Sequence, residues 1–312
     1  MIDSERVLRT ARRPLVLGIG GGGDVVGALA TAESVRLYDG AQPIVGGVTW
    51  ERRPIDPVPG PRRVAEIEAA HEVAPGILLA GPDTHIRGRG VHFAESHMAR
   101  FLGQDTVLVD VHLGPAGIAA GLAAAAERLN VDLIVFVDVG GDVLAQGHEP
   151  GLSSPLCDAL MLAAATALAQ TGVEVLGGVF GIGCDAELTP QEVLALIARL
   201  ARDGGLAGAR GLTDPVATRL EEAIALVPTE ASAQAVRAFR GATGPQVIRG
   251  GRRTVQLSSA AALTYYFDVG AAFSGVGRLA RAVAGAGSLQ EANAALGRLG
   301  VRTELDVELE AA

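Results

Sequence analysis

The sequence predicts an α/β fold of Rossmann-like type, with a mostly parallel sheet, helices on both of its faces and a smaller helical and mixed C-terminal appendage. In the first two thirds of the 312 residues, short runs rich in β-branched residues alternate with Ala-rich stretches, as in successive βαβ units. The runs are apolar almost throughout, which is typical of parallel strands buried on both faces. We therefore expect a ligand-binding core over residues 1–205 and an appendage packed on it over residues 206–312.

Five apolar runs are predicted to form the strands of this core. They are Pro14–Ile19, Ile44–Trp50, Thr106–His112, Leu133–Val139 and Val173–Phe180. Signals for helix starts lie outside these runs. Ser154 precedes a proline, and Thr189 and Ser288 each begin a capping box, in which a hydroxyl residue is followed three positions later by Glu. Helices are therefore expected to begin at these three positions.

The pattern changes after residue 205. Glycine-rich connectors at 204–215 and 241–251 lie on either side of two predicted helices, Pro215–Leu226 and Glu230–Phe239. The closing segment 301–310, VRTELDVELE, alternates apolar and polar residues, which predicts a strand with one side facing solvent.

Bulk composition limits the partners and the compartment. The formal net charge is −9, which argues against a nucleic-acid partner, because that binding depends on Lys and Arg neutralising phosphates. Cys157 and Cys184 are too few for a disulfide framework. Gly18 interrupts the first apolar run too early for a membrane span or a signal peptide. We expect a cytoplasmic protein with no membrane partner.

Three apolar runs share an ending in which glycines are followed by an aspartate. These endings place Asp24, Asp142 and Asp185 after strands, and Asp110 closes a fourth strand. Because the carboxyl ends of parallel strands meet at one edge of a sheet, these side chains are expected to lie around one crevice. Carboxylates gathered there repel one another unless a positive charge lies among them, and Mg²⁺ prefers carboxylate oxygens. We therefore predict a magnesium site formed by Asp24, Asp142 and Asp185. Two alternatives remain: each aspartate only caps the helix that follows it, or the acids bind a cationic or hydroxyl-rich substrate.

The glycine loops and the end of the second strand are predicted to bind the ligand. Backbone amides at helix N-termini attract anions, and an arginine can neutralise a substrate carboxylate or phosphate. The predicted binding residues are Gly20, Gly21, Gly22, Gly23, Asp24, Glu51, Arg52, Gly140 and Gly141.

A dinucleotide cofactor is the alternative interpretation of the first glycine loop. Gly18, Gly20 and Gly23 have the G-x-G-x-x-G spacing after a strand and before a helix. This motif also needs an acid about 20 residues further on to bind the ribose, and Glu51 lies beyond that spacing. Asp24 would also crowd a pyrophosphate, because it follows the last glycine directly.

The loop after Asp142 supplies the predicted proton-transfer groups. Glu149 is the first candidate for a general acid or base because it is an acid on a loop near the strand ends, and His148 is the second. With Asp142 they form the predicted catalytic set. We expect an enzyme of hydrolase, lyase or cyclase type, without redox chemistry, acting on a small polar metabolite of phosphate-like or amino-acid-like anionic character.

Two other functions remain open from the sequence. One is an enzyme that depends on NAD(P) or another nucleotide, and the other is a non-catalytic protein that binds a metabolite. The Ala-rich helix predicted over Ile118–Leu129 has a small-residue surface that could pack against a second copy, so a homodimer is expected.

Several segments together resemble an uncharacterised family of archaeal and bacterial proteins known as domain of unknown function 1152. They are GIGGGGDVVGA, TWERRPIDPVPGP, VDVGGDVLAQGHEPGLSSPLCDA, GIGCDAEL, YYFD and EANAALGRLGVRTELD. The resemblance spans nearly the whole chain and implies no activity. The chain is also similar to D-glutamate cyclases in having Gly23-Asp24, Glu51-Arg52 and Gly140-Gly141-Asp142 in that order. This second similarity implies non-redox chemistry on a small acid or amide.

Overall fold

A nine-stranded sheet forms the centre of the computed structural model, which describes residues 2–312. The strand order is β3-β4-β5-β2-β1-β6-β7-β11-β8, and β5, β2, β1, β6 and β7 run parallel to one another. Antiparallel strands extend the sheet at both edges. The strands are β1 (Pro14–Gly18), β2 (Ile44–Val48), β3 (Ile67–Ala74), β4 (Ile77–Ile86), β5 (Thr106–Val109), β6 (Leu133–Val139), β7 (Val175–Phe180), β8 (Leu206–Gly211) and β11 (Leu263–Phe267).

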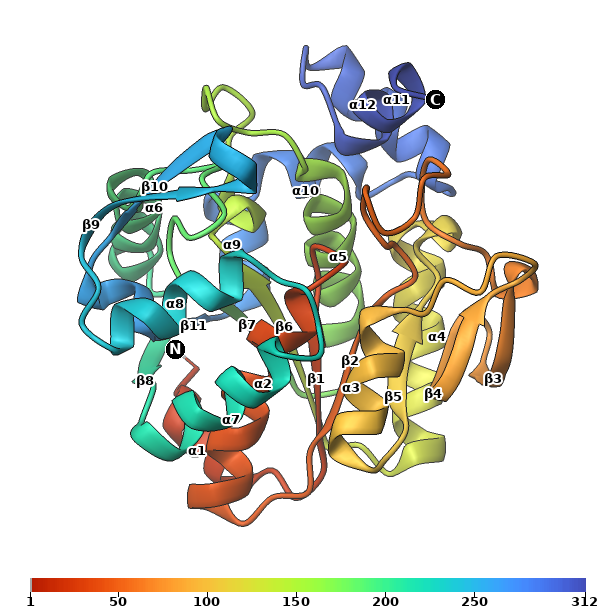
Figure 1. Ribbon diagram of the computed structural model, residues 1–312, viewed down its shortest axis with the longest axis horizontal. Helices are drawn as coiled ribbons and strands as arrows, with labels where there is room; N and C mark the ends of the chain where they lie inside the picture. The colour runs from red at the N-terminus through yellow and green to blue at the C-terminus, as the bar shows by residue number, and fades with distance from the viewer. Residues whose placement is uncertain (1) are drawn as a thin grey trace.

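Helices cover both faces of this sheet, as the sequence predicts (Figure 1). One face carries α1 (Ser4–Thr10), α2 (Asp24–Ser34), α3 (Ala94–Leu102), α7 (Asp214–Ile224) and α8 (Ala231–Phe239). The other carries α4 (Gly114–Leu129), α5 (Pro155–Ala169), α6 (Pro190–Arg202), α9 (Val269–Gly275), α10 (Arg278–Val283) and α11 (Leu289–Arg298). The Rossmann-like fold class is therefore confirmed.

The two faces have separate apolar cores, which explains why the central strands are apolar throughout. In β1, Leu15 and Leu17 belong to the core on the α4 and α5 side, while Val16 belongs to the core on the α2 side. Alternate side chains of a strand point to opposite faces, so both sets must be apolar. All five residues of β1 are buried.

The strand order reverses between β1 and β6. From β1 the chain continues outward through β2, and it later returns to place β6 on the other side of β1. The loops after these two neighbouring strands diverge at this point, which leaves a crevice at the carboxyl ends of the strands. The glycine loop after β1 and the loop after β6 that carries Asp142 both lie at this crevice.

Several strands were not predicted from the sequence. The hairpin of β3 and β4 has charged and exposed residues, so its pattern does not match that of a buried parallel strand. Strands β8 and β11 come from the segment after residue 205, yet they continue the main sheet from β7. The sheet therefore crosses the predicted boundary between residues 205 and 206, and the division into core and appendage stays a prediction.

A second, two-stranded sheet lies in the predicted glycine connector. It is the hairpin of β9 (Gly244–Ile248) and β10 (Arg253–Leu257), whose apolar side packs on α8 and its neighbours through Ile248, Val255 and Leu257. Figure 1 shows this hairpin at the same end of the molecule as the C-terminal helices.

The closing segment is helical, so its prediction as a strand is wrong. Residues Glu304–Glu310 form α12, and Thr303 begins it with a capping box that includes Asp306. The side chain of Thr303 accepts a hydrogen bond from the Asp306 amide, and the Asp306 carboxylate accepts one from the Thr303 amide. This start signal outweighs the short alternation of apolar and polar residues.

The helix predicted to form a homodimer is α4, and its apolar side is covered within the chain. Ile118, Leu122 and Ala125 are buried in the core that α4 shares with α5. The outward side of α4 still presents small residues, including Ala116 and Ala120, and the homodimer remains a prediction. No helix within residues 2–312 combines the length and the apolar character needed to cross a membrane.

The capping box at the start of α6 provides a test of the predicted helix boundaries. The Thr189 hydroxyl accepts a hydrogen bond from the Glu192 amide, as expected. Thr189→Ala should lower the free energy of unfolding by about 1 kcal/mol, because one amide loses its acceptor. Urea denaturation measures the change. Thr10→Ala, at the last residue of α1, is the control and should change stability by less than about 0.5 kcal/mol; equal effects of the two substitutions would contradict the capping role.

Candidate functional site

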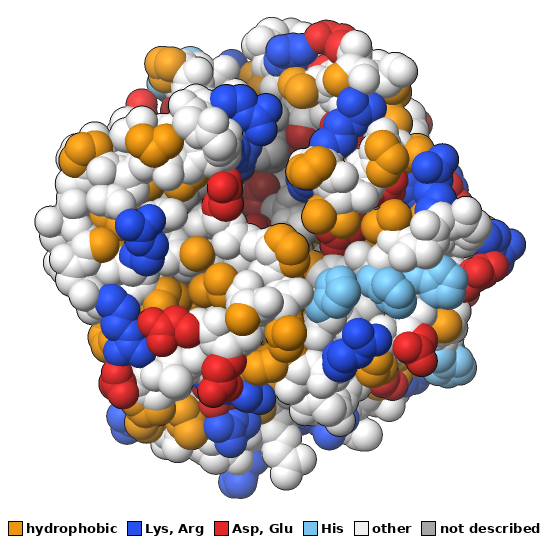
Figure 2. Space-filling model, in the orientation of Figure 1, with side chains coloured by type: hydrophobic (Ala, Val, Ile, Leu, Met, Phe, Trp, Pro, Cys, Tyr) orange, Lys and Arg blue, Asp and Glu red, His pale blue; other side chains and the backbone are white. Residues whose placement is uncertain are grey.

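A cavity of about 1000 Å³ lies at the crevice between β1 and β6. Its walls come from the glycine loop 20–24, the loop after β2, the start of α5, the loop after β7, the β9–β10 hairpin and α12. Nine acidic residues and five arginines line it, and no histidine among residues 2–312 does. Figure 2 shows the opening in the upper half of the view, with acidic side chains at its floor and basic side chains on both sides.

Three carboxylates converge at the floor of the cavity, where Asp142 and Asp158 line it and Asp138 lies next to them outside the lining. Asp138 is the sixth residue of β6, Asp142 follows the loop after that strand, and Asp158 lies in the first turn of α5. One oxygen from each lies within 4.8 Å of the other two, a spacing at which one cation can bind all three. We call these three residues the floor triad.

Asp142 also faces a second pair of acids after β7. Oxygens of Asp142, Asp185 and Glu187 likewise lie within 4.8 Å of one another. The two oxygens of Glu187, however, already accept hydrogen bonds from the amides and hydroxyls of Ser153 and Ser154, at 2.5–2.9 Å. A carboxylate has room for about four such bonds. Glu187 therefore serves to fix the start of α5, and the floor triad is the better cation site.

Asp158 has an unsatisfied oxygen. Its side chain is 1% exposed, and its Oδ1 atom has no hydrogen-bond partner among the described residues. Leaving a buried polar atom without a partner costs about 1–3 kcal/mol. This atom points to a ligand that the protein's own groups do not supply.

Asp24 has an identifiable function in the glycine loop. Its Oδ2 atom accepts a hydrogen bond of 2.9 Å from the Gly20 amide, so the carboxylate lies on the inner side of the loop. A Cβ on Gly20 would come within 2.5 Å of this oxygen and within 3.4 Å of Asp158 Oδ2. Only glycine at position 20 leaves room for both carboxylates.

Protein packing accounts for the other glycines of this loop. A Cβ on Gly23 would lie 2.4 Å from the Thr229 Cβ, and one on Gly21 would lie 2.8 Å from the Trp50 carbonyl oxygen. The loop is therefore closely covered by neighbouring chain. At position 140, a Cβ would lie 2.3–2.6 Å from the Asp185 carboxylate, so this glycine also makes room for an acid.

Burial and mutual repulsion raise the pKa values of these acids. Burial, with Asp138 close by, raises the pKa of Asp24 to about 8, and burial raises that of Asp138 to about 7. Burial and neighbouring carboxylates hold the pKa values of Asp142, Asp158 and Asp185 well above their usual range. Without a cation the group therefore retains protons at neutral pH.

Glu51 is a further buried acid on the cavity wall. Its Oε1 atom accepts a hydrogen bond of 2.6 Å from the Ala94 amide at the start of α3. Burial raises the pKa of Glu51 to about 7. Burial and the nearby Glu51 hold the pKa of Glu95 well above its usual range.

Arg52 is held between the glycine loop and α12. Its Nη2 atom donates hydrogen bonds to the Gly20 carbonyl oxygen (2.5 Å) and to Glu304 (3.3 Å), and its guanidinium lies 4.1 Å from the Trp50 ring centre. Glu304 also accepts hydrogen bonds from the Leu156 and Cys157 amides at the start of α5. The C-terminal helix thus fixes both Arg52 and α5.

The structure brings most of the predicted binding residues together. Gly20 to Gly23, Asp24, Glu51, Arg52, Asp142 and Asp185 all line the cavity. Gly140 and Gly141 do not line it, and they lie behind the acids of the loop. In the predicted magnesium set, Asp142 and Asp185 share a group of possible ligands, while Asp24 adjoins Asp158 through Gly20.

Glu149 and His148 lie outside the lining of the cavity, and their predicted catalytic roles stay predictions. The Glu149 carboxylate accepts hydrogen bonds from the amides of Gln146, Gly147 and His148 at 2.7–3.0 Å, so it stabilises its own loop. His148 is exposed, and neither residue lines the cavity. Asp110 does not line the cavity either, and it forms a separate contact with His112. Burial would raise the pKa of Asp110, but the hydrogen bonds from His112 outweigh burial and lower it.

Sequence reasoning missed three acids of the site: Asp138 and Asp158 of the floor triad, and Glu187, which fixes the start of α5. Asp138 is the only charged residue in the apolar run Leu133–Val139, and that isolation was an available signal. Asp158 lies in a first helical turn, where the helix dipole alone favours an acid. Glu187 lies two residues after Asp185, and no sequence motif singled it out. The local sequence therefore predicted the positions of the loops better than it predicted which side chains these loops bring together.

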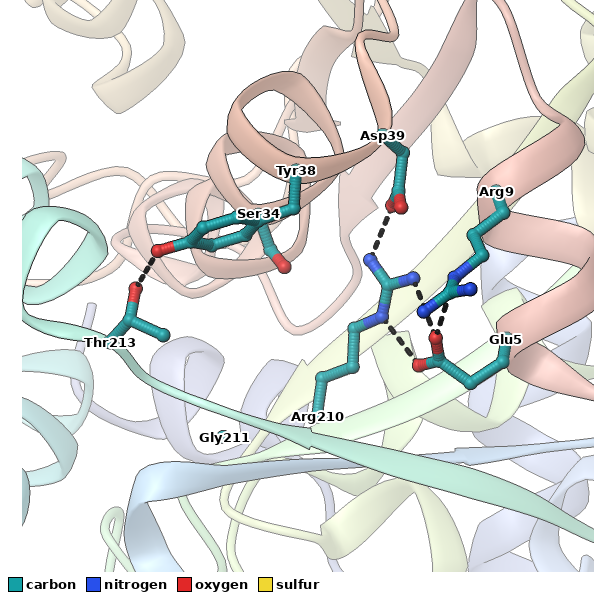
Figure 3. A pocket seen from close by; sticks show the side chains of 8 residues that line it. All are labelled: Glu5, Arg9, Ser34, Tyr38, Asp39, Arg210, Gly211 and Thr213. Carbon is teal, nitrogen blue, oxygen red and sulfur yellow. Dashed lines mark hydrogen bonds and ion pairs between the residues drawn. The ribbon is translucent and has the colours of Figure 1, made fainter.

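A smaller cavity of about 650 Å³ lies apart from this site, between α1, the end of α2 and β8. Its charged groups are paired, as Figure 3 shows: Arg210 donates hydrogen bonds to Glu5 and to Asp39, at 2.7 and 2.6 Å. Tyr38 and Thr213 share a hydrogen bond of 2.7 Å. These paired groups form a structural network between α1, α2 and β8.

The fold and the cavity define a Rossmann-like α/β protein with a carboxylate-rich cavity where the strand order reverses. The chain belongs to the family described as "Protein of unknown function (DUF1152)", whose model matches residues 15–312. The predicted family membership is therefore confirmed. No curated protein and no solved structure matches the chain. The similarity to D-glutamate cyclases stays a prediction.

Gly20→Ala tests the packing of the carboxylates around the glycine loop. The added Cβ should push the Asp24 carboxylate from its position and lower the free energy of unfolding by about 1–3 kcal/mol. Gly285→Ala is the matched control, because a Cβ there has no atom within 4 Å outside its immediate chain neighbours. Chemical denaturation of both variants measures the difference. Equal stability of the two variants would show that the loop tolerates a side chain at position 20.

The raised pKa values predict that the cation-free protein becomes less stable as pH rises. The unfolded chain releases the protons of Asp and Glu near pH 4, whereas the folded protein holds those of Asp24 and Glu51 to about pH 8 and about pH 7. Between about pH 5 and pH 8 the folded state therefore binds more protons, and the free energy of unfolding falls with pH. Thermal unfolding in EDTA at pH 5.5, 7 and 8.5 should give the highest Tm at pH 5.5. A Tm that rises over this range would contradict the assignment.

Proposed function

We propose that this protein is an enzyme that binds a small anionic metabolite together with a divalent cation at the carboxyl ends of its strands, and that its reaction is non-redox, of hydrolase, lyase or cyclase type. In this proposal the floor triad of Asp138, Asp142 and Asp158 binds the cation. Arg52 lies on the cavity wall and neutralises part of the charge of the metabolite.

The observation that carries the proposal is the unpartnered Oδ1 atom of Asp158 beside two further carboxylates. Buried acids can be satisfied by amides and hydroxyls alone, as Glu187 and Glu149 are. Asp158 is buried without such a partner for one of its oxygens. A cation bound to the three carboxylates would satisfy this atom and offset the repulsion among them.

The donor set favours a hard cation. The floor triad offers oxygen atoms alone, which suit Mg²⁺ and Mn²⁺ better than zinc, and the two cysteines are buried with raised thiol pKa values. Magnesium is therefore the proposed cofactor. When bound, such an ion supplies charge neutralisation and polarises an oxygen of the substrate or of water.

Asp24 and Glu51 are the proposed proton-transfer groups. Both line the cavity, neither belongs to the floor triad, and their pKa values of about 8 and about 7 lie near the pH of the cell. A general acid or base works best when its pKa is close to the working pH. They replace Glu149 and His148, whose side chains face other surroundings.

A dinucleotide cofactor receives less support. In a dinucleotide-binding loop the glycine amides approach a pyrophosphate. Here the Asp24 carboxylate accepts a hydrogen bond from the Gly20 amide, and Thr229 packs against Gly23. Both features use the space and the donors that a pyrophosphate would need.

Removal of one carboxylate from the floor triad tests the cation site. Asp158→Asn and Asp142→Asn should each weaken Mn²⁺ binding at least tenfold, because a ligand and its charge are lost. They should not lower the Tm of the cation-free protein at pH 8, since each substitution removes a buried, repelled acid. Isothermal titration with MnCl₂ and thermal unfolding in EDTA measure the two effects.

Asp83→Asn is the control for these variants, since Asp83 is exposed and far from the cavity lining. It should bind Mn²⁺ as the unchanged protein does. Failure of the unchanged protein to bind Mn²⁺ or Mg²⁺ would overturn the proposed function. A large loss of stability in Asp142→Asn with intact Mn²⁺ binding would instead assign this residue a structural role.

A further inference from the structure

The β9–β10 hairpin places arginines on the cavity wall. Ile248, Val255 and Leu257 are buried against the core and fix the two strands of the hairpin. Arg249, Gly250 and Gly251 have φ angles of 51°, 62° and 91°, so the tip folds back within a few residues. This tight turn leaves Arg249, Arg252 and Arg253 along the cavity.

The hairpin arginines are only partly paired. Arg253 donates hydrogen bonds to the Ser153 hydroxyl (2.7 Å) and to the Ala186 carbonyl oxygen (3.2 Å). The Nη2 atom of Arg249 lies 3.8 Å from Glu187, and its side chain is 40% exposed. Because the oxygens of Glu187 are occupied by the two serines, this acid cannot satisfy the donors of Arg249. The hairpin therefore presents guanidinium groups with unused donors.

The opposite wall presents a second guanidinium group with an unused donor. The Nη2 atom of Arg52 is hydrogen-bonded, but its buried Nη1 atom lies 3.9 Å from Glu308 Oε1 and has no partner within hydrogen-bond distance among residues 2–312. The stacking on Trp50 and the contacts to Glu304 hold this guanidinium in place. A fixed, buried cationic donor without an acceptor indicates that an anion binds here.

We propose that the anionic group recognised in this cavity is a phosphate or diphosphate, held between Arg249 and Arg253 of the hairpin on one side and Arg52 on the other. This inference rests on the proposed function, since the acids of the floor require a cation between themselves and the anion. A phosphate group has several terminal oxygens in a tetrahedral arrangement and can use guanidinium donors from two walls. A carboxylate has two oxygens in one plane and would leave one of the walls without an acceptor.

We expect this binding to depend on the cation. Nine acids and five arginines line the cavity. A divalent cation at the floor triad would add positive charge beside the anion and give its oxygens a further ligand. The volume of about 1000 Å³ exceeds what a diphosphate alone needs, which fits a phosphorylated metabolite with a sizeable organic part.

Binding of inorganic pyrophosphate to the full chain tests this inference. With Mg²⁺ in excess over pyrophosphate, the ligand should raise the Tm and give a measurable heat of binding, and it should do neither in EDTA. Citrate under the same conditions is the carboxylate probe and should bind at least tenfold more weakly. The unliganded Tm of each variant below shows whether it is folded.

Arg249→Gln is the first variant, because this exposed side chain is not needed for the fold, and Arg253→Gln is the second. Each should weaken pyrophosphate binding at least tenfold and leave Mn²⁺ affinity unchanged. Arg237→Gln is the matched control: Arg237 contacts the same hairpin through Gln246 but does not line the cavity. It should bind pyrophosphate as the unchanged protein does.

Three results would overturn the inference, and they can be distinguished from one another. If Mn²⁺ binds but pyrophosphate does not, the phosphate assignment fails while the proposed function stands. If citrate binds as tightly as pyrophosphate and Arg249→Gln weakens both, the site recognises carboxylates. If neither Mn²⁺ nor Mg²⁺ binds to the unchanged protein, the proposed function fails and the phosphate inference fails with it.

Discussion

The crowding of buried carboxylates at the point where the strand order reverses is the constraint on which the rest of the site depends. The parallel strands bring Asp24, Asp138 and Asp142 to one place, and α5 adds Asp158 from the side. These groups cannot all ionise together in a buried space unless positive charge lies among them. Three other features of the site accommodate these acids. Glycines make room for them, amides donate hydrogen bonds to some of them, and arginines lie nearby.

Two kinds of buried acid can be distinguished by their hydrogen bonds. Glu149, Glu187 and Glu304 accept bonds from amides or hydroxyls at the turns they stabilise, and they behave as parts of the scaffold. Asp158 and Asp142 face other acids instead, and one oxygen of Asp158 has no partner among the described residues. This difference, rather than the number of acids, separates the proposed cation site from the acids that support it.

Much of the fold could be predicted from the sequence because buried parallel strands are apolar on both faces. The strands β1, β2, β5, β6 and β7 were predicted for this reason, and their ends differ from the prediction by only a few residues. Edge strands do not obey the same rule. Strand β8 has the sequence LAGARG and was taken for a connector, because its place in the sheet depends on pairing with β11 and not on its own side chains.

The site could be predicted less completely, for a related physical reason. Loop composition indicates where an acid can lie, but the direction of its side chain depends on distant partners. Glu149 turns back to the amides of its own loop, whereas Asp158, which looked like an ordinary first-turn acid, faces the floor of the cavity. The arginines of the hairpin were also overlooked, since their position depends on how β9 and β10 pack on α8.

The contact between α12 and the start of α5 has a consequence for the order of folding. Arg52 contacts both Gly20 and Glu304, and Glu304 also accepts a hydrogen bond from the Leu156 amide. The cavity wall therefore joins segments that lie far apart in the sequence. Contacts between such distant segments form late, because closing long loops costs entropy that local contacts cannot recover. We expect α12 to dock after the sheet and its two layers have formed. A molecule in which α12 is undocked would lack the wall that Glu304, Val307 and Glu308 give to the cavity.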